Sequence, residues 1–225
     1  MSKAIRQAVR ARRITRLCHF TQVSSLSGIL GQRALLSSAE AARRRLKISV
    51  NDRFRQDRHL DHVCCSVQYP NLYLLNRYRE STGSAVDWVV LLISPTLLEL
   101  RSTLYSPVNA ATGSGAHIGD GITGFNQMFM SQPPAKAHQV RTSTHLASCP
   151  TSLQAEVLVH RSISASEVVG VVVESDDVID RVRPFLEKFG RPAPTVYSKF
   201  RFFETNFVQT RIELGYEIDL GTRRN

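Results

Sequence analysis

The sequence has little of what builds metal clusters, disulfide frameworks or membrane spans. Only four of its 225 residues are cysteines, and none of them forms a C-x-x-C pair. This spacing argues against a structural zinc site and against a disulfide framework, and it favours a reducing compartment. The longest apolar run, Trp88–Ile93, is too short to cross a bilayer, and no secretory signal is visible. We therefore expect a cytoplasmic protein that has no metal and no membrane anchor.

Acidic residues are absent from the start of the chain, where the first carboxylate is Glu40. The whole chain carries a formal net charge of +10. An excess of this size attracts phosphate backbones and predicts a polyanionic partner; a basic surface that serves only solubility is the alternative. Residues 1–13 are a basic extension or helix, whose cations contact nucleic-acid phosphates or face solvent. The basic residues ahead of the first motif are Lys3, Arg6, Arg10, Arg12, Arg13 and Arg16.

Length and composition predict one α+β domain spanning residues 1–225. With 42% hydrophobic residues the chain can bury one substantial core, and no repeat or linker interrupts it. Apolar runs predict strands, Pro-Asn and Ser-Asp-Asp starts predict helices, and glycine-rich or aperiodic stretches predict loops. The expected strands are 14–20, 63–67, 88–93, 168–173 and 195–203. The expected helices are 24–30, one that begins at residue 70, and 175–190. The expected loops are 113–124 and 131–152, and residues 46–50 form a strand or a helical turn.

Residues 153–160 read as one more strand, whose two faces differ in chemistry. One face is wholly apolar, and the other presents Gln154 two residues before Glu156. A carboxylate and a carboxamide so placed can grip a sugar hydroxyl and steer an acceptor. The alternative is a glutamate on the solvent-facing side of an antiparallel strand. The apolar face comprises Leu153, Ala155, Val157 and Val159, and the other comprises Gln154, Glu156, Leu158 and His160.

Four short motifs follow one another along the chain. They are Cys18-His19-Phe20-Thr21 with the Gly28 stretch behind it, the arginine-rich residues 51–57, residues 105–111, and the Gln-x-Glu strand. In this order and spacing they resemble the DarT family, the DNA ADP-ribosyltransferase toxins of bacterial toxin–antitoxin modules. The resemblance covers most of the chain, from His19 to the strand near Phe203.

The resemblance implies an ADP-ribosyltransferase-like fold, with two packed β-sheets, an NAD cleft between them and flanking helices. His19 and Thr21 match the family's H-x-T element, which contacts NAD near its nicotinamide ribose, and Gly28 belongs to the same cofactor-binding region. An arginine of the polar segment engages NAD phosphate. Arg53 and Arg55 are both eligible, and Arg55 is preferred because it shares a short motif with Asp57.

The resemblance also assigns the reacting residues and the acceptor. Glu156 falls on the family's catalytic glutamate, Gln154 lies two residues before it, and the 131–152 loop, with Arg141, lies where the acceptor is recognised. Asn109 faces the cleft or caps a turn. The implied partners are single-stranded DNA and an antitoxin that reverses or blocks the modification. Some branches of the family modify thymine and others guanine, and the Tyr69-Pro70-Asn71 element favours guanine.

The chemistry is physically reasonable for these residue types. Breaking the bond between nicotinamide and ribose builds an oxocarbenium-like centre, which a nearby carboxylate stabilises as it forms. A base inside a duplex is unreachable, which favours single-stranded DNA as the acceptor. One alternative keeps the fold but changes the acceptor to a protein side chain or water. Another is a basic nucleic-acid-binding module without activity, against which His19, Thr21, Arg55 and Glu156 together argue.

Overall fold

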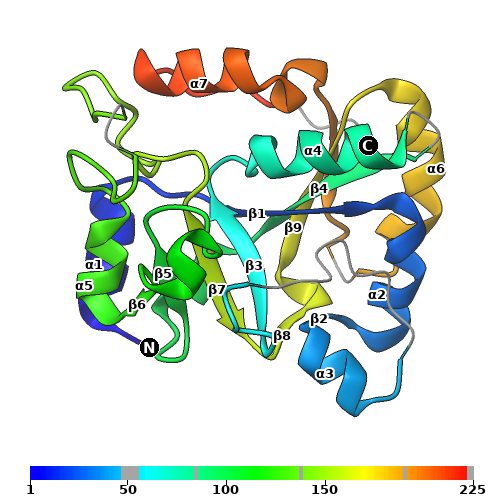
Figure 1. Ribbon diagram of the computed structural model, residues 1–225. Coiled ribbons are helices and arrows are strands. Elements are labelled where there is room, and N and C mark those ends of the chain that lie inside the picture. Colours follow the sequence, from blue (N-terminus) through cyan, green and yellow to red (C-terminus); the bar gives the residue numbers. More distant parts are fainter. Residues whose placement is uncertain (47–55, 84–85, 137–138, 190–191, 222–225) are drawn as a thin grey trace.

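The computed structural model describes residues 1–46, 56–83, 86–136, 139–189 and 192–221. It contains an eight-stranded sheet with the strand order β10-β9-β4-β1-β3-β7-β5-β6, and a two-stranded sheet, β2-β8 (Figure 1). All pairs are antiparallel except β9 with β10, which the helix α6 connects. The strands are β1 (Leu17–Gln22), β2 (Ala34–Leu36), β3 (His62–Val67), β4 (Trp88–Ile93), β5 (Leu104–Ser106), β6 (Gly119–Asp120), β7 (Glu156–His160), β8 (Ser162–Ser164), β9 (Val168–Val173) and β10 (Thr195–Ser198).

The large sheet divides between β1 and β3. β1 pairs with β4 along its whole length, but it pairs with β3 at only two positions, Leu17 with Val67 and Cys18 with Ser66. Beyond Cys18 the two strands separate, and in Figure 1 β1 runs across the view while β3 and β7 run down it. The two sheets expected from the sequence are therefore two halves of one continuous sheet, with an opening where they diverge.

The run Trp88–Ile93 is continuous in apolar residues because β4 is buried on both faces. Val89, Leu91 and Ile93 belong to one core cluster, whereas Trp88, Val90 and Leu92 belong to another. Each fully buried side chain of this kind contributes about 1.5–3 kcal/mol. The strand expected at 88–93 is thus confirmed, and it anchors the half-sheet that carries β1.

Helices cover both faces and both ends of the sheet. α4 and α7 lie over the face that carries Trp88, and α6 packs with the opposite cluster (Figure 1). α1 and α5 pack together at the end near β5 and β6. The helices are α1 (Lys3–Ala11), α2 (Leu26–Gln32), α3 (Ser38–Arg43), α4 (Leu72–Thr82), α5 (Gly121–Gln127), α6 (Asp176–Leu186) and α7 (Thr205–Glu213), and the 3₁₀ turns are Val23–Ser25, Pro95–Glu99, Thr112–Gly115, Ala165–Glu167 and Phe200–Phe203.

Several expected elements have different boundaries. β7 begins at Glu156, because a turn precedes it in which the Ala155 N–H bonds to the Ser152 carbonyl. The first expected strand begins at Leu17 rather than at residue 14, and the last ends at Ser198 and continues as a 3₁₀ turn. α2 starts at Leu26, and no serine side chain caps it. Residues 47–50 lie outside the described residues.

The expected glycine-rich loop at 113–124 is wrong in its second half, which forms β6 and the start of α5. A Cβ on Gly124 would lie 2.6 Å from the carbonyl carbon of Gly119, so Gly124 lets α5 pack directly on β6. Residues 131–152, by contrast, contain no helix or strand in their described part, as expected. None of the helices formed by the described residues has the length and apolar character needed to cross a membrane.

Candidate active site

A cavity opens where β1 and β3 separate. It measures about 200 Å³ and adjoins a second cavity of about 350 Å³. His19, Thr21, Leu36 and Val63 line both, so the two form one continuous cleft. The divergence of the strands explains the cleft, because it leaves the space between the half-sheets unfilled.

His19 bridges the opening. Its Nδ1 lies 2.8 Å from the carbonyl oxygen of Cys64 on β3. A carbonyl only accepts hydrogen bonds, so Nδ1 carries the proton and Nε2 of the neutral ring is left as an acceptor. Burial lowers the pKa of His19 below its ordinary value, against a smaller opposing effect of the Cys64 hydrogen bond. The imidazole is therefore neutral at neutral pH, and Nε2 can accept a hydrogen bond from a hydroxyl or amide group.

Glu156 stands at the start of β7 and lines the first cavity. It is only 5% exposed, which is incompatible with a glutamate on a solvent-facing strand surface. Its Oε1 accepts from Asn109 Nδ2 at 3.1 Å and from Asn71 Nδ2 at 3.4 Å, and its Oε2 accepts from the Ala110 N–H at 3.2 Å. Three neutral donors thus fix both oxygens of the carboxylate.

The side-chain amides of Asn71 and Asn109 each accept one hydrogen bond from the backbone and donate one to Glu156. The Asn71 Oδ1 caps α4 by accepting from the Leu74 N–H at 3.2 Å, and the Asn109 Oδ1 accepts from the Ala111 N–H at 3.0 Å. These bonds fix the orientation of each amide, so that its NH₂ group points to Glu156. Asn109 therefore both caps a turn and faces the cleft, which were the two alternatives that the sequence left open.

The second cavity extends from His19 towards α2. Gly28 lines it, and a Cβ at that position would meet nothing within 4 Å. The glycine is not needed for packing inside the protein, so the open space beside it remains available to a bound molecule. Thr21, which is 7% exposed, lies between the two cavities and lines both.

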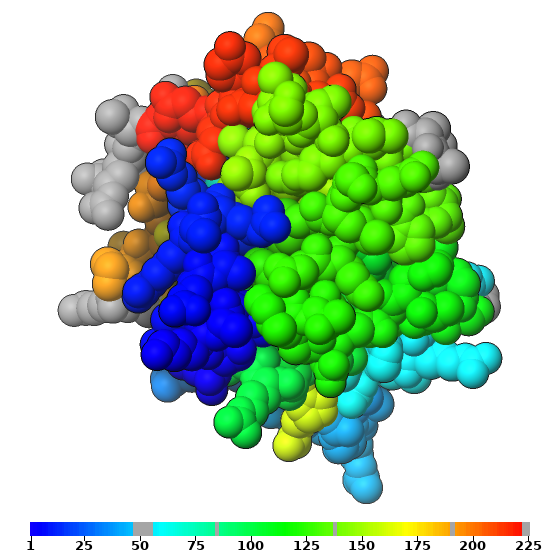
Figure 2. Space-filling view, turned by 90° about the vertical axis from the view of Figure 1, so that its left-hand side faces the viewer, coloured from blue at the N-terminus to red at the C-terminus, as the bar shows by residue number. Residues whose placement is uncertain are grey.

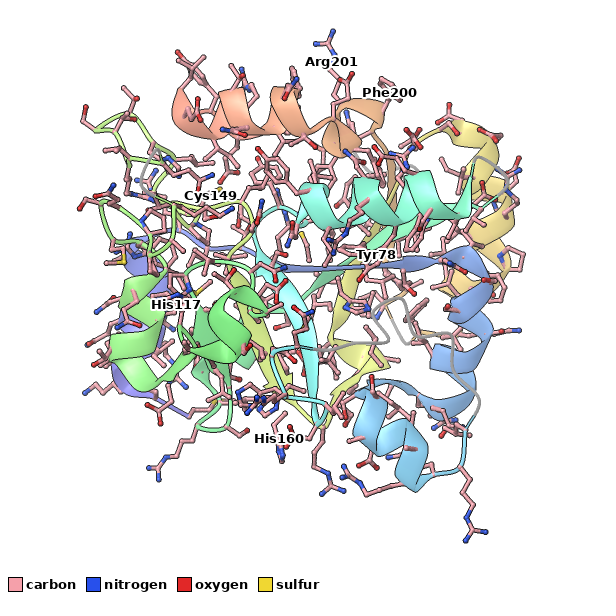
Figure 3. The ribbon with its side chains drawn as sticks, in the orientation of Figure 1. Tyr78, His117, Cys149, His160, Phe200 and Arg201 are labelled. Atoms are coloured by element: carbon pink, nitrogen blue, oxygen red, sulfur yellow. The ribbon has the colours of Figure 1, made fainter. Side chains whose placement is uncertain are left out.

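Aromatic side chains close the first cavity on the α4 side. Tyr78 points from α4 towards β1 (Figure 3) and stacks on Trp88 with ring centroids 6.3 Å apart. It also contacts Phe20, and both Phe20 and Tyr78 line the cavity. Tyr78 therefore packs against its aromatic neighbours and also forms part of the cleft wall.

Two of the predicted site residues do not join this cleft among the described residues. Gln154 lies on the turn before β7, and it is absent from the cavity lining. Arg141 donates to the carbonyl oxygens of Cys149 at 2.8 Å and Leu146 at 3.0 Å. Arg141 thus ties together the 131–152 segment, rather than presenting its guanidinium to a ligand. Arg53 and Arg55 lie outside the described residues.

The 131–152 segment lies next to the basic N-terminal helix. The Arg12 guanidinium sits 3.9 Å from the centre of the Phe129 ring, and that of Arg141 sits 5.8 Å from it. Figure 2 shows the N-terminal residues beside the green and yellow-green chain, which includes this segment. Burial lowers the pKa of Arg141, and the charge of Arg12 lowers it further. Two partly buried cations therefore lie on the Phe129 ring where the helix meets the loop.

The Tyr69-Pro70-Asn71 element is part of the protein interior. Tyr69 is 1% exposed, and its hydroxyl accepts from the Ile218 N–H at 2.8 Å. Asn71 is occupied with α4 and Glu156. Tyr69 is therefore a structural residue, whereas Asn71 lines the cleft and bonds to the catalytic candidate.

Sequence reasoning missed three groups that build the site. The Pro70-Asn71 pattern signals a helix start, but it says nothing about the bond from Asn71 to Glu156. The Cys64 carbonyl and the Ala110 N–H are backbone groups, which leave no residue-type signal. These contacts arise only when β3, β7 and the segment after β5 are brought together.

Comparison with known proteins agrees with this architecture. A family model described as "ssDNA thymidine ADP-ribosyltransferase, DarT" matches residues 18–203. No curated protein matches the chain in sequence. Among solved structures, DarT of Thermus sp. 2.9 in complex with ADP-ribosylated ssDNA is 16% identical with a TM-score of 0.59, and its complex with NAD⁺ is 18% identical with a TM-score of 0.57. In both comparisons 84% of this chain and 96% of the Thermus chain are covered.

DarTG of Thermosipho africanus in complex with ADP-ribose is similar as well, at 15% identity and a TM-score of 0.57. That comparison covers 84% of this chain but 51% of the Thermosipho chain. At these identities the solved structures establish a shared fold, and the family match rests on the sequence model.

Proposed function

The chain belongs to the DarT family of ssDNA thymidine ADP-ribosyltransferases, and from that membership we propose that it transfers ADP-ribose from NAD to a base of single-stranded DNA and releases nicotinamide. The observation that carries the proposal is the Glu156 carboxylate, fixed by Asn71, Asn109 and the Ala110 N–H inside the cleft. A carboxylate with a purely structural role does not have to line a cavity. Here it lines the same cavity as His19.

In the proposed reaction, the bond between the nicotinamide nitrogen and the ribose carbon breaks, and its electron pair leaves with nicotinamide. Positive charge develops on the ribose, and the fixed Glu156 carboxylate stabilises it. A nitrogen of the acceptor base then forms the new bond to the ribose carbon. The proton that this nitrogen loses passes to Glu156, which acts as the general base.

The cleft has the features that NAD requires. Two connected cavities give room for the two halves of a dinucleotide, and the space beside Gly28 lets a ligand approach the α2 backbone. The His19 Nε2 accepts from a hydroxyl or from the nicotinamide amide, and Thr21 adds a hydroxyl next to it. The phosphate contact is proposed for Arg55, with Arg53 as the alternative.

The DNA strand is proposed to run over the positive surface formed by α1 and residues 131–152. Lys3, Arg10 and Arg13 are exposed there, while Arg12 and Arg141 hold the helix and the loop through Phe129. Exposed cations attract phosphate without reading sequence, and the base is presented to Glu156. Arg141 is accordingly a positioning residue of the acceptor loop in this proposal. Gln154 lies beside the loop and is a candidate for contact with the acceptor.

We take thymidine as the modified nucleoside, because the matching family model is described by it, and guanine, which the Tyr69-Pro70-Asn71 element favours, is the alternative. Modification of DNA bases is harmful to the cell that makes the enzyme. A toxin role with a cognate antitoxin, acting in the cytoplasm where DNA and NAD occur together, follows from this proposal.

The test is a mass measurement on oligonucleotides. The protein is incubated with NAD and single strands that contain or lack thymidine, and the expected product is a thymidine-containing strand heavier by one ADP-ribose. Glu156→Gln is the inactive control. A heavier strand without thymidine would reassign the base. Labelling of a protein, or release of nicotinamide without any modified strand, would replace DNA as the acceptor.

A further inference from the structure

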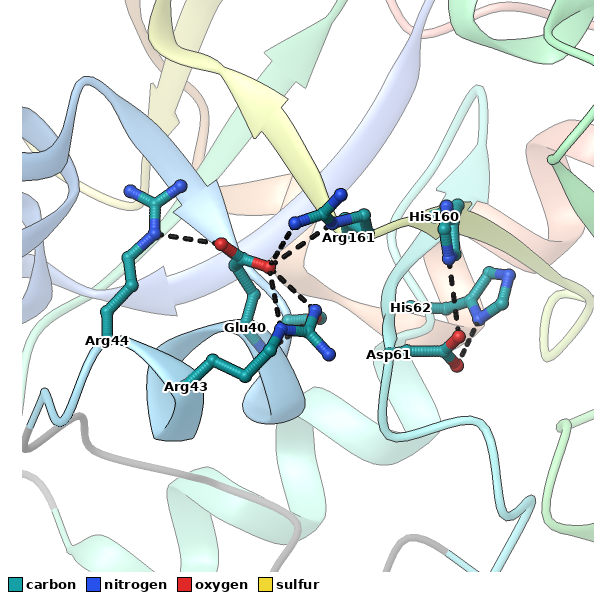
Figure 4. Close-up of polar contacts among 8 residues, drawn as sticks. Glu40, Arg43, Arg44, Asp61, His62, His160 and Arg161 are labelled. Atoms are coloured by element: carbon teal, nitrogen blue, oxygen red, sulfur yellow. Dashed lines mark hydrogen bonds and ion pairs between the residues drawn. The ribbon is translucent and has the colours of Figure 1, made fainter.

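A second group of ionisable side chains lies away from Glu156, at the other end of β7. His62 begins β3 and His160 ends β7, and the two residues are register partners. The Asp61 carboxylate bridges the two rings from one side: its Oδ1 is 2.8 Å from His62 Nδ1, and its Oδ2 is 3.3 Å from His160 Nε2 (Figure 4). His59 completes the group, with its ring centroid 5.3 Å from that of His62.

The backbone holds these four residues in place. The His62 N–H bonds to the His59 carbonyl at 3.0 Å, closing a turn with a histidine at each end. The Asp57 carboxylate accepts from the His59 N–H at 3.1 Å, and the Arg161 N–H donates to the Asp61 carbonyl at 2.6 Å. Because β3 and β7 are paired, the position of His160 opposite His62 is fixed as well. The backbone hydrogen bonds and the β3–β7 pairing therefore position these four residues next to one another.

From this geometry we propose that His59, Asp61, His62 and His160 bind one divalent transition-metal ion, zinc being the best fit. One ligand atom each from His59, Asp61 and His62 lie within 4.8 Å of one another. Neighbouring donors of a tetrahedral zinc site lie about 3.3–3.5 Å apart, given bonds of about 2.0–2.2 Å. The His160 Nε2 lies 3.3 Å from Asp61 Oδ2, so the proposed fourth ligand is next to the other three.

The donor set selects the kind of metal. Three imidazoles and one carboxylate suit zinc, cobalt, nickel or copper, whereas magnesium and calcium prefer oxygen ligands. The neighbouring cation does not oppose binding, because the Arg161 guanidinium is directed to Glu40 instead (Figure 4). The expectation that the chain binds no metal rested on cysteine spacing, which says nothing about histidines on paired strands.

The proposed ion is not part of the transfer reaction. It would join the start of β3 to the end of β7, and His62 also lines the cleft, so the ion would brace the wall of the cleft opposite β1. Its role is therefore to stabilise the half-sheet that carries Glu156. Transfer itself is expected to continue after chelation.

The experiment uses the full chain without a histidine tag, stripped with a chelator and titrated with Co²⁺ and then Zn²⁺. We expect one Co²⁺ per chain with the visible absorption of a tetrahedral site, and displacement of that absorption by Zn²⁺. Zn²⁺ is also expected to raise the melting temperature. Absence of saturable binding, or binding only of several ions without the tetrahedral spectrum, would overturn the proposal.

Variants separate this site from adventitious binding. His62 is buried, so its removal can disturb the fold, whereas the His160 side chain is 40% exposed. His160→Ala and Asp61→Asn should each lower the affinity for Zn²⁺ about tenfold or more. His145→Ala removes a histidine that bonds to the Pro150 carbonyl and should leave affinity unchanged. Equal affinity in His160→Ala and the unaltered protein would contradict the site, whether or not the protein modifies DNA.

Discussion

Two buried glutamates in this molecule have different neighbours among the described residues. Glu40 on α3 and Glu156 on β7 are 6% and 5% exposed. Arg43, Arg44 and Arg161 surround Glu40 at 2.6, 2.9 and 3.2 Å (Figure 4). The described donors to Glu156 are instead two carboxamides and one backbone N–H.

The difference shows what each carboxylate is for. The arginines, led by Arg43 and Arg44, lower the pKa of Glu40 to about 2, so its charge is both secured and cancelled. Such an anion is of little use to a positive charge that develops elsewhere. The Asn71, Asn109 and Ala110 dipoles orient the Glu156 carboxylate inside the cleft, where it can stabilise an oxocarbenium-like centre.

Glu40 also supports the shape of the backbone. Arg161 has a φ of 64°, a conformation that costs a residue with a side chain roughly 1–3 kcal/mol. Its carbonyl accepts from the Ser37 N–H at 2.9 Å, and its guanidinium bonds to Glu40. The cluster thereby fixes the passage from β7 to β8 against α3. Glu40 is a structural carboxylate, and its neighbourhood holds the far end of the catalytic strand in place.

The largest effect is expected from exchanging the carboxylate that faces the cleft. Glu156→Gln removes the negative charge at the same size and should lower the rate of transfer by about 10²–10³-fold, in line with the loss of one preorganised electrostatic contact. Single-turnover mass spectrometry measures it. Glu40→Gln is the matched control and should keep the rate. If the two variants lost activity equally, the contrast between the two glutamates would have no functional meaning.

The next effect tests the neutral donors. Asn109→Ala removes one amide donor from Glu156 and the cap on Ala111. A lost hydrogen bond to a charged group is worth about 1.5–3 kcal/mol, so kcat should fall roughly 10- to 100-fold. KM for NAD should change less, because the carboxylate acts mainly in the transition state.

Asn76→Ala is the control for that variant. Asn76 lies one turn along the same helix as Asn71, and its Nδ2 donates to Thr205 Oγ1 at 2.9 Å. It should retain wild-type kcat with a modest loss of stability. A larger loss of kcat in Asn76→Ala than in Asn109→Ala would remove Asn109 from the site.

Part of the contrast between Glu40 and Glu156 could be predicted from the sequence. The family motifs gave Glu156, His19, Thr21 and Asn109, and the structure brings all four to one cavity. The arginine cluster could not be foreseen, because Arg161 is more than a hundred residues from Glu40 and meets it only through the β2–β8 pairing. The contacts of Arg141 could not be foreseen for a related reason, since its partners are backbone carbonyls that carry no sequence signal.

The strand carrying Glu156 illustrates the same limit. Alternation predicted a strand from residue 153, but the Ser152 carbonyl closes a turn there, and the strand starts at Glu156 itself. Gln154 consequently does not share a strand face with Glu156. Strands buried on both faces, such as β4, were predictable because their apolar runs leave no other arrangement.

A smaller effect, on stability, comes from Glu40. Its pKa in the folded protein is about 2, below the ordinary value of 4.5, so its stabilising contribution is fully present above that ordinary value and is lost as the pH falls towards 2. Glu40→Gln should therefore melt at a lower temperature than the unaltered protein at pH 6–7, and the two curves should converge near pH 2. Thermal melts across this range check the sign. A gap that widened in acid would contradict the pairing.

The smallest effect separates Arg44, which bonds to Glu40, from two exposed arginines at and just beyond the C-terminal end of α1. Arg10→Ala with Arg13→Ala removes two exposed cations from the proposed DNA surface. The slope of log affinity against log salt should fall by about one to two, since each phosphate neutralised on a single strand contributes roughly 0.7.

Arg44→Ala removes a cation that already bonds to Glu40, and it should leave the slope unchanged. Fluorescence anisotropy with a labelled single strand at several salt concentrations measures all three proteins. The comparison depends on position, because Arg44 caps the C-terminal end of α3, which lies across the molecule from α1 (Figure 1). If Arg44→Ala lowered the slope as much as the double variant, the positive surface would extend to α3, and the strand would cross the molecule on the side of the Glu40 cluster instead.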